Sequence, residues 1–255
     1  MKNGTRLPLR REENGERLRG RRPLGRRGAI AMDGPAGVGK STVGTLVAKE
    51  LGYRFLNTGE MYRALTWKAL ERGLDLEDGA ALARLSRALK WEFRPGEDGV
   101  VLRTFVDGTG VTLHIRDERV SMNSSRVSGK PGVRRHMREL QRLLGKAGGI
   151  VMEGRDITTV VLPDADLKVY LDASPDERAR RRTRQLRAQG KKADFRRIRE
   201  SIVQRDRQDA ERRINPLRKA DDAVLIDSTR LTMREVAERI LRLFRKKMRG
   251  VPRRS

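Results

Sequence analysis

Short apolar runs separated by helix-forming stretches recur along this chain. The runs lie at residues 29–32 (AIAM), 149–152 (GIVM), 167–171 (LKVYL) and 223–226 (AVLI). Each is bounded by turn residues and interleaved with helical periodicity, which is the pattern of buried parallel strands joined by helices. The sequence therefore predicts an α/β fold with a doubly wound parallel sheet covered on both faces.

The pattern changes to period two between residues 91 and 116. Apolar and polar residues alternate at 91–94 and 111–116, residues 100–106 are strand-like, and GEDG and DGTG supply turns. We expect a small antiparallel three-stranded lobe inserted into the parallel core. His114 falls on the polar face of the third predicted strand and His136 lies among arginines, so both are interpreted as surface histidines.

Two helices have clear boundaries. One is predicted over residues 42–50 with Gly52 as its C-terminal cap. The other begins at the capping box formed by Thr232 and Glu235 and ends before Gly250 and Pro252. Both carry one apolar stripe, which is typical of packing helices.

Composition limits the possible classes of protein. The chain has 255 residues, 36% of them hydrophobic, which suffices for one sizeable core. Having no cysteine, it cannot form disulfides, thiolate metal sites or a cysteine nucleophile. The sequence shows no signal peptide and no long apolar run, so we expect a cytoplasmic protein without a membrane partner.

The chain is strongly basic, with a formal charge of +25, and this favours anionic partners. Residues 1–28 carry ten Lys/Arg against three Glu without apolar periodicity and are predicted to form a disordered basic tail. Its acidic residues argue against a mitochondrial presequence, while an RNA-binding arm stays open as an alternative. Residues 249–255 form a second basic tail.

The chemistry centres on residues 29–42, which read AIAMDGPAGVGKST. Gly34, Gly39, Lys40 and Ser41 match the pattern GxxxxGK[ST] between a strand and a helix. Such glycines let backbone N–H groups surround phosphate oxygens, and the helix directs its positive end at them. Lys40 would then reach the terminal phosphates and the Ser41 hydroxyl would ligate Mg²⁺. The alternative is an ordinary tight turn with a solvated lysine.

Two further stretches offer groups for anions. Thr58 and Arg63 lie in the first turns of a helix that follows NTG, where both can donate to phosphate oxygen. After the run GIVM and the residues Glu153 and Gly154 come Arg155 and Asp156, at the sheet edge where α/β proteins bind ligands. This second pair could equally form a structural ion pair.

Five ordered segments together resemble bacterial cytidylate kinases, P-loop kinases of nucleoside monophosphates, over about residues 29–248. They are MDGPAGVGKST, NTGEMYRA, GVTLHIR, EGRDITTVVLPDADLKVYLDAS and QRDRQDAERRINPLRKADDAVLIDS. The resemblance implies a monophosphate-binding insert at about residues 85–125 and a helical lid at about 176–214. The chain departs from the family at Asn57 and Glu60, where Asp and Ala are more usual, and this bears on the tuning of the acceptor site.

The resemblance also implies roles for individual residues. The donor triphosphate would be held by the loop residues Gly34, Pro35, Ala36, Gly37, Val38, Gly39, Lys40, Ser41 and Thr42, with Ser41 on the metal. The acceptor phosphate would be held by Thr58, Arg63, Arg155 and Arg212. The cytosine would be read by Ser125, Arg134 and Asp156, and the ribose region by Arg205 and Asp209.

A cytosine edge offers an amine donor and two acceptors, which a carboxylate and a guanidinium can satisfy together. The attacking oxygen of a monophosphate is already anionic, so alignment and charge neutralisation carry the reaction without a general base. The arginine-rich segment 176–219, which includes the lid, has seventeen Lys/Arg against seven Asp/Glu. Among its candidates Arg178, Arg181 and Arg182, we assign Arg181 a catalytic role with Lys40, Arg155 and Arg212.

The expected activity is therefore phosphate transfer from MgATP to CMP, and to dCMP, by a monomer with no specific nucleic-acid partner. One rival is a small P-loop kinase acting on another monophosphate, which a panel of acceptors would identify. The other is a nucleic-acid-binding ATPase, whose turnover would respond to RNA or DNA and whose affinity would fall steeply with salt. The basic segments lack an aromatic platform for bases, which counts against that rival.

Overall fold

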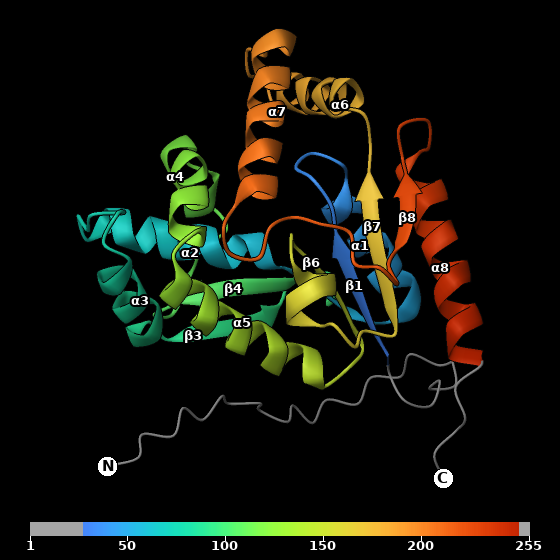
Figure 1. Cartoon of the computed structure of the whole chain (residues 1–255), viewed down its shortest axis with the longest axis horizontal. Helices are drawn as coiled ribbons and strands as arrows, with labels where there is room; N and C mark the ends of the chain where they lie inside the picture. Colours follow the sequence, from blue (N-terminus) through green and yellow to red (C-terminus); the bar gives the residue numbers. More distant parts are fainter. Residues whose placement is uncertain (1–27, 250–255) are drawn as a thin grey trace.

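The computed structural model describes residues 28–249, and a five-stranded parallel sheet forms its centre (Figure 1). The strand order is β2-β6-β1-β7-β8. The strands are β1 (Ala29–Asp33), β2 (Arg54–Asn57), β6 (Ile150–Glu153), β7 (Leu167–Asp172) and β8 (Val224–Asp227). All four pairings are parallel. The predicted doubly wound α/β fold is confirmed.

Alternation along the strands sends side chains into two cores. Ile30 and Met32 of β1 pack with α1 (Lys40–Leu51) and α8 (Met233–Arg249) on one face. Ala31 packs on the other face with α2 (Thr58–Glu71) and α5 (Pro131–Lys146). These helices bury their apolar stripes against the strands, which fixes the carboxyl ends of β1 and β6 side by side.

A second, antiparallel sheet lies against the outer edge of β2. It consists of β3 (Trp91–Pro95), β4 (Leu102–Val106) and β5 (Thr109–Gly110), and Phe55 of β2 forms a bridge with Val101 beside it. Two helices accompany this region, α3 (Gly79–Ala88) and α4 (Glu118–Ser128). The first two antiparallel strands lie where the sequence predicts them, and the lobe has three strands as expected.

The predicted position of the third strand is wrong. Residues 111–115 are not a strand, because pairing stops at Gly110 and residues His114–Arg116 form the 3₁₀ helix η1. The Ile115 N–H donates to the Val111 carbonyl at 3.0 Å, and Leu113 between them is exposed. Burial of residues four apart is helical spacing, which a period-two reading of the same letters misses. His114 is exposed and stacks on Trp67, with ring centroids 4.0 Å apart.

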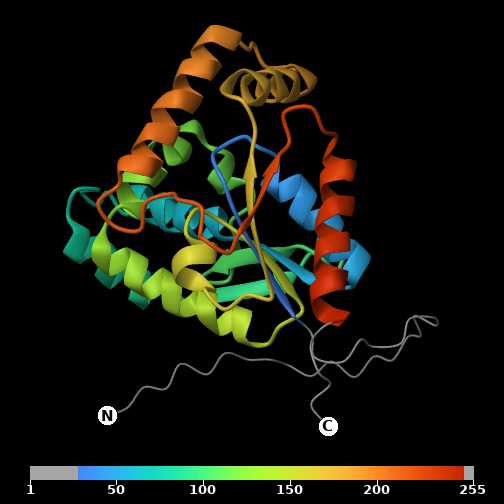
Figure 2. The same cartoon turned by 45° about the vertical axis from the view of Figure 1, so that its right-hand side comes forward.

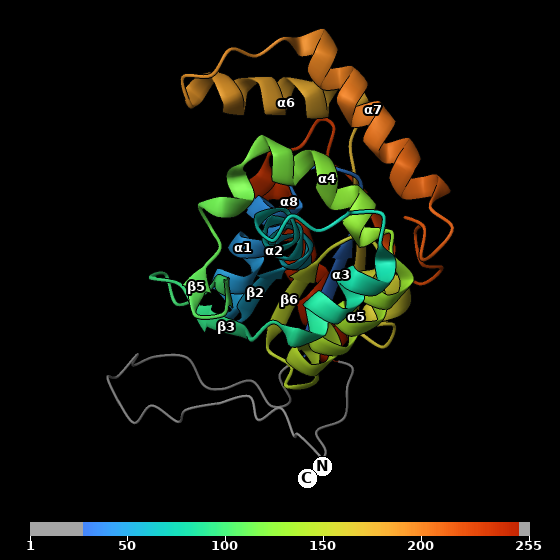
Figure 3. The same cartoon turned by 90° about the vertical axis from the view of Figure 1, so that its left-hand side faces the viewer.

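Helices α6 (Pro175–Ala188) and α7 (Phe195–Glu211) project beyond the carboxyl ends of the strands, above β7 in Figure 1 and over α4 in Figure 3. Figure 2 shows α7 leading back down toward the sheet. No helix within residues 28–249 has the length and apolar character needed to cross a membrane. The sequence predicts basic tails at residues 1–28 and 249–255. Of these, residues 1–27 and 250–255 lie outside the described residues, and Arg249 is the last residue of α8.

Candidate functional site

The glycine-rich loop joins β1 to α1 at the centre of the sheet. Gly34 has a φ of 145°, and a Cβ at this position would collide with the carbonyl oxygen of Leu171 on the neighbouring strand. Gly39, with a φ of 98°, immediately precedes α1, and its Cβ would collide with the sulfur of Met233. Only glycine fits either position, so the predicted loop pattern is required by its geometry.

Lys40 turns its ammonium group back into this loop. Its Nζ donates to the carbonyl oxygens of Gly34 and Pro35, each at 2.7 Å, and the side chain is buried. Burial, together with the positive charge of Arg155, lowers the pKa of Lys40 to about 7. A phosphate group in the loop would provide the missing counter-charge for this lysine.

Ser41 lies on the first turn of α1 and faces a buried carboxylate. Its hydroxyl donates to Glu153 Oε1 at 2.5 Å, and Asn57 Nδ2 approaches the same hydroxyl at 3.5 Å. Hydroxyl and carboxylate oxygens are the donors that Mg²⁺ prefers, and Mg²⁺ takes few protein ligands when phosphates bind it as well. The arrangement therefore fits the predicted metal ligand Ser41. Within residues 28–249 no cluster of three or more His, Asp or Glu could hold a metal alone.

The predicted acceptor-phosphate residues begin at the neighbouring strand β2. Thr58 opens α2 and donates to the carbonyl of Glu153 at 2.7 Å. Arg63 lies one turn later, and burial lowers its pKa. Burial also raises the pKa of Glu60, which faces the charges of Arg63 and Arg103. Glu60, a departure from the family pattern, thus lies in the electrostatic surroundings of Arg63.

Arg155 and Asp156 occupy the turn after β6, but they do not pair with one another. Arg155 Nε donates to Asp209 of α7 at 2.8 Å. Asp156 Oδ2 accepts from Arg134 of α5 at 2.5 Å and from Asn215 at 3.1 Å. The Arg134–Asp156 pair is buried, with side-chain exposures of 5% and 8%. The two residues therefore face different partners, as two different ligand parts would require.

Tyr62 packs beside the Arg134–Asp156 pair, and the Arg134 guanidinium lies 5.5 Å from the centroid of its ring. Arg205 of α7 has a buried Nε with no hydrogen-bond partner among the described residues, and burial lowers its pKa. Arg212 donates instead to the carbonyls of Ile214 and Asn215. Buried donors without a full set of partners are common where a ligand completes the site.

The structure brings most of the predicted ligands to one edge of the sheet, from β1, α2, α5, β6 and α7. Ser125 lies on α4, half-buried, with its carbonyl accepting from Gly129 N–H and Ser128 Oγ. No hydrogen bond of its side chain links it to Arg134 or Asp156 in the described part of the chain. Its predicted contact with the base stays a prediction.

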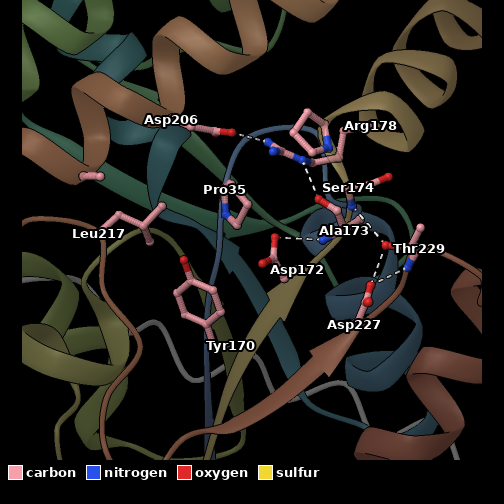
Figure 4. Close-up of a pocket in the computed structure, with 12 residues that line it drawn as sticks. Pro35, Tyr170, Asp172, Ala173, Ser174, Arg178, Asp206, Leu217, Asp227 and Thr229 are labelled. Carbon is pink, nitrogen blue, oxygen red and sulfur yellow. Dashed lines mark hydrogen bonds and ion pairs between the residues drawn. The ribbon is translucent and has the colours of Figure 1, made fainter.

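The lid arginines differ in their surroundings. Arg181 donates to the carbonyl of Val38 in the loop and to Ser228. Arg178 is buried and donates to the carbonyls of Ala173 and, in the loop, Ala36 at 2.9 and 3.1 Å. Its guanidinium also pairs with Asp206 of α7 at 2.6 Å (Figure 4). Arg182 donates to Gln185 within its own helix.

A pocket lies beside the loop, between the ends of β7 and β8 and helix α7 (Figure 4). Its walls include Pro35, Tyr170, Asp172, Arg178, Asp206 and Leu217. Asp172 and Asp227 in this wall accept the backbone N–H groups of Ala173 and Thr229 at 2.8 Å each. Two of its wall residues come from the sequence predictions, Pro35 of the loop and the lid candidate Arg178, so the pocket adjoins the phosphate loop.

Sequence reasoning missed several residues of the site. Glu153 holds Ser41, Asn215 holds Asp156, and Asp33 accepts three hydrogen bonds at the end of β1. Asp33 and Glu153 each carried a signal, because each is a charged residue that ends a buried strand directly before a glycine. Tyr62 carried no signal beyond its helical position.

Known proteins resemble this chain over most of its length. The family model for cytidylate kinase matches residues 30–246. A cytidylate kinase of Geobacillus thermodenitrificans is 48% identical over 88% of this chain and 99% of its own length. A bifunctional pantoate ligase/cytidylate kinase of a Synechococcus strain is 48% identical over 89% of this chain. The chain spans only 41% of that bifunctional relative.

Among solved structures, a shikimate kinase from Acinetobacter baumannii aligns over 86% of this chain and 94% of its own. Its sequence identity is 17% and its TM-score 0.42, a likeness too loose to bear on function.

Proposed function

Because the chain belongs to the cytidylate kinase family, we propose that it transfers the γ-phosphate of MgATP to CMP, and to dCMP, releasing ADP and the diphosphate. The observation that carries the proposal is the turn after β6, next to the phosphate loop. Arg155 on this turn suits a phosphate, and Asp156, held by the buried Arg134, suits a cytosine edge.

The chain's own groups account for alignment and charge neutralisation. The loop N–H groups and Lys40 would hold the donor triphosphate, while Thr58, Arg63, Arg155 and Arg212 would hold the acceptor phosphate. Ser41, supported by Glu153, would hold Mg²⁺, which neutralises charge on the donor phosphates when bound. No general base is needed, since the acceptor oxygen is anionic at neutral pH.

The helices α6 and α7 would act as the lid. Arg181 reaches the loop carbonyl of Val38, and Arg205 and Asp209 lie on α7 beside Arg155. Closure of these helices would exclude water and so protect ATP from hydrolysis. We propose that the enzyme acts as a monomer.

Base selectivity follows from the chemistry of Asp156. A carboxylate accepts from the N4 amine of cytosine but repels the O4 oxygen of uracil. Binding UMP would place the uracil O4 against this buried carboxylate with no donor between the two oxygens, which costs free energy. Arg155 would contact a phosphate present in every monophosphate and would not select the base.

The test compares CMP, dCMP, UMP, AMP and GMP as acceptors in a coupled assay of ADP release. Asp156→Asn should lower kcat/KM for CMP and narrow the gap to UMP, because an amide can rotate to donate to uracil O4. A hydrogen bond to a charged group contributes about 1.5 to 3 kcal/mol. The expected loss for CMP is therefore roughly tenfold to a hundredfold or more.

Arg155→Ala is the matched control on the adjacent residue and should depress CMP and UMP use alike. Asp156→Asn could instead lower kcat/KM for CMP and for UMP by the same factor and leave their ratio unchanged. That result would show that Asp156 does not recognise cytosine. Preference for an acceptor other than CMP or dCMP in the unaltered protein would overturn the proposed substrate itself.

A further inference from the structure

Asp33 is a fully buried carboxylate at the end of β1, one residue before the glycine-rich loop. Its Oδ1 accepts from Ile157 N–H at 2.9 Å. Its Oδ2 accepts from Thr158 N–H at 2.7 Å and from the Thr158 hydroxyl at 2.6 Å. All three donors belong to one short segment, which begins directly after Asp156.

That segment is the single π-helical turn η2 (Ile157–Val161). The first N–H groups of any helix have no acceptor within the helix, and a cap residue normally supplies one. Here the cap position belongs to Asp156, a residue type that caps well, yet its side chain makes no capping bond. Asp33 from another strand accepts the N–H groups of Ile157 and Thr158 instead.

The consequence concerns where Asp156 can point. Because Asp33 occupies the N–H groups of η2, the Asp156 carboxylate is available to Arg134 and Asn215 on the opposite side. Without Asp33, the N–H groups of η2 would be buried and unpaired, and Asp156 itself would be the nearest carboxylate able to satisfy them.

We propose that Asp33 is a positioning residue for base recognition: by capping η2 from β1, it keeps the Asp156 carboxylate directed toward Arg134 and the acceptor base. This inference rests on the proposed role of Asp156 in reading cytosine. Asp33 directly precedes Gly34 of the donor loop and also bonds the turn that follows Asp156. The same buried side chain therefore sets the spacing between the donor loop and the base pocket.

The principal test is Asp33→Asn, which keeps the shape but replaces one acceptor oxygen by an NH₂ group that cannot accept. We expect KM for CMP to rise at least tenfold and the preference for CMP over UMP to shrink. KM for ATP should change less than threefold, although Asp33 adjoins the loop. A general structural fault would instead raise KM for both CMP and ATP and leave the preference for CMP over UMP unchanged.

Thr158 supplies graded controls on the same contact. Thr158→Val removes only the hydroxyl donor and should lower the CMP preference about twofold to threefold, and Thr158→Ser should restore it. If Asp33→Asn does not fold, this pair of variants carries the test alone. Equal CMP preference in Thr158→Val and the unaltered protein would then overturn the proposal.

The double variant Asp33→Asn/Asp156→Asn shows whether Asp33 acts through Asp156. If it does, the double variant should have the same CMP to UMP ratio as Asp156→Asn alone, because the group being positioned is already lost. The inference would be overturned if the change of this ratio in the double variant equalled the product of the changes in the two single variants. If Asp156→Asn alone leaves the ratio unchanged, the proposed base recognition fails first, and that outcome is distinct from a failure confined to Asp33.

Discussion

Lys40 combines a buried ammonium group with a phosphate loop that bears no other full positive charge. In the described structure its Nζ is held by two carbonyl oxygens, which solvate the charge only in part. The lowered pKa, about 7, follows from this burial and from the nearby Arg155. A triphosphate would reverse the balance, because its negative charge favours the protonated form.

We therefore predict that the protein takes up protons when it binds MgATP. At pH 8 a lysine with a pKa of about 7 is mostly neutral, and a bound triphosphate would raise its pKa well above 8, toward the ordinary lysine value of about 10.4. Protons are therefore bound and not released when MgATP binds. The uptake approaches one proton near pH 8 and vanishes below about pH 6, where Lys40 is already charged. Titration calorimetry of MgATP binding in buffers of different ionisation enthalpy measures this number.

Lys40→Met is the control for this measurement, since it removes the titrating group and should abolish the uptake at pH 8. Equal proton uptake in the variant and the unaltered protein would assign the proton elsewhere. The same variant should lose turnover by several orders of magnitude while retaining the fold.

At the scale of elements, the predicted lid is attached to the phosphate loop by one buried side chain. Arg178 of α6 contacts the loop through Ala36, the end of β7 through Ala173, and α7 through Asp206. Only 4% of its side chain is exposed. A displacement of α7 against α6 must therefore strain or break a contact that also reaches the loop.

We predict that Arg178→Met disturbs both stability and donor binding. Removing one partner of a buried ion pair leaves the other charge uncompensated, at a cost of about 3 kcal/mol. Thermal unfolding should show this loss, and KM for ATP should rise because the carbonyl of Ala36 loses its donor.

The matched control joins the same two helices at their surface. Arg199 of α7 pairs with Asp176 of α6 at 2.6 Å, but about half of each side chain is exposed. Arg199→Gln should change the unfolding temperature and KM for ATP little, as exposed pairs contribute little. Similar effects of Arg199→Gln and Arg178→Met would contradict the special role of Arg178. They would show that any contact between α6 and α7 supports stability and ATP binding equally.

At the scale of the whole molecule, the formal charge of +25 far exceeds what the site uses. The arginines assigned to ligands are few, and many of the others lie exposed on α6, α7 and α8. Residues 1–27 contribute ten basic and three acidic residues to this charge. Charge of this kind binds nucleic acid without sequence preference and without serving catalysis.

Deleting residues 1–27 should leave kcat and KM for CMP nearly unchanged, because the residues assigned to the site all lie within residues 28–249. The truncated protein should bind DNA or RNA more weakly, with a smaller dependence of affinity on salt. Steady-state kinetics and a filter-binding assay at several salt concentrations measure the two effects. A large loss of CMP turnover on truncation would assign the first 27 residues a part in the enzyme.

The strands and the loop could be predicted from the sequence because their signals are local. Buried parallel strands are apolar on both faces, and GPAGVGKS needs glycine where Gly34 and Gly39 adopt positive φ values. The predicted strand at 111–116 is wrong because it also rests on a local pattern alone. Val111 and Ile115 are compatible with both period two and helical spacing, and only packing distinguishes the two.

The sequence by itself determined that a phosphate loop lies between a strand and a helix in an α/β chain, since those patterns span few residues. Tertiary structure alone decided the partners: Glu153 for Ser41, Asp209 for Arg155, and Asp33 for the turn that follows Asp156. These pairs are separated by 54 to 124 residues in the chain. The pairs of Ser41 and Asp33 form because parallel pairing aligns the carboxyl ends of β1 and β6, whereas Asp209 reaches Arg155 from α7. No local pattern encodes either long-range contact.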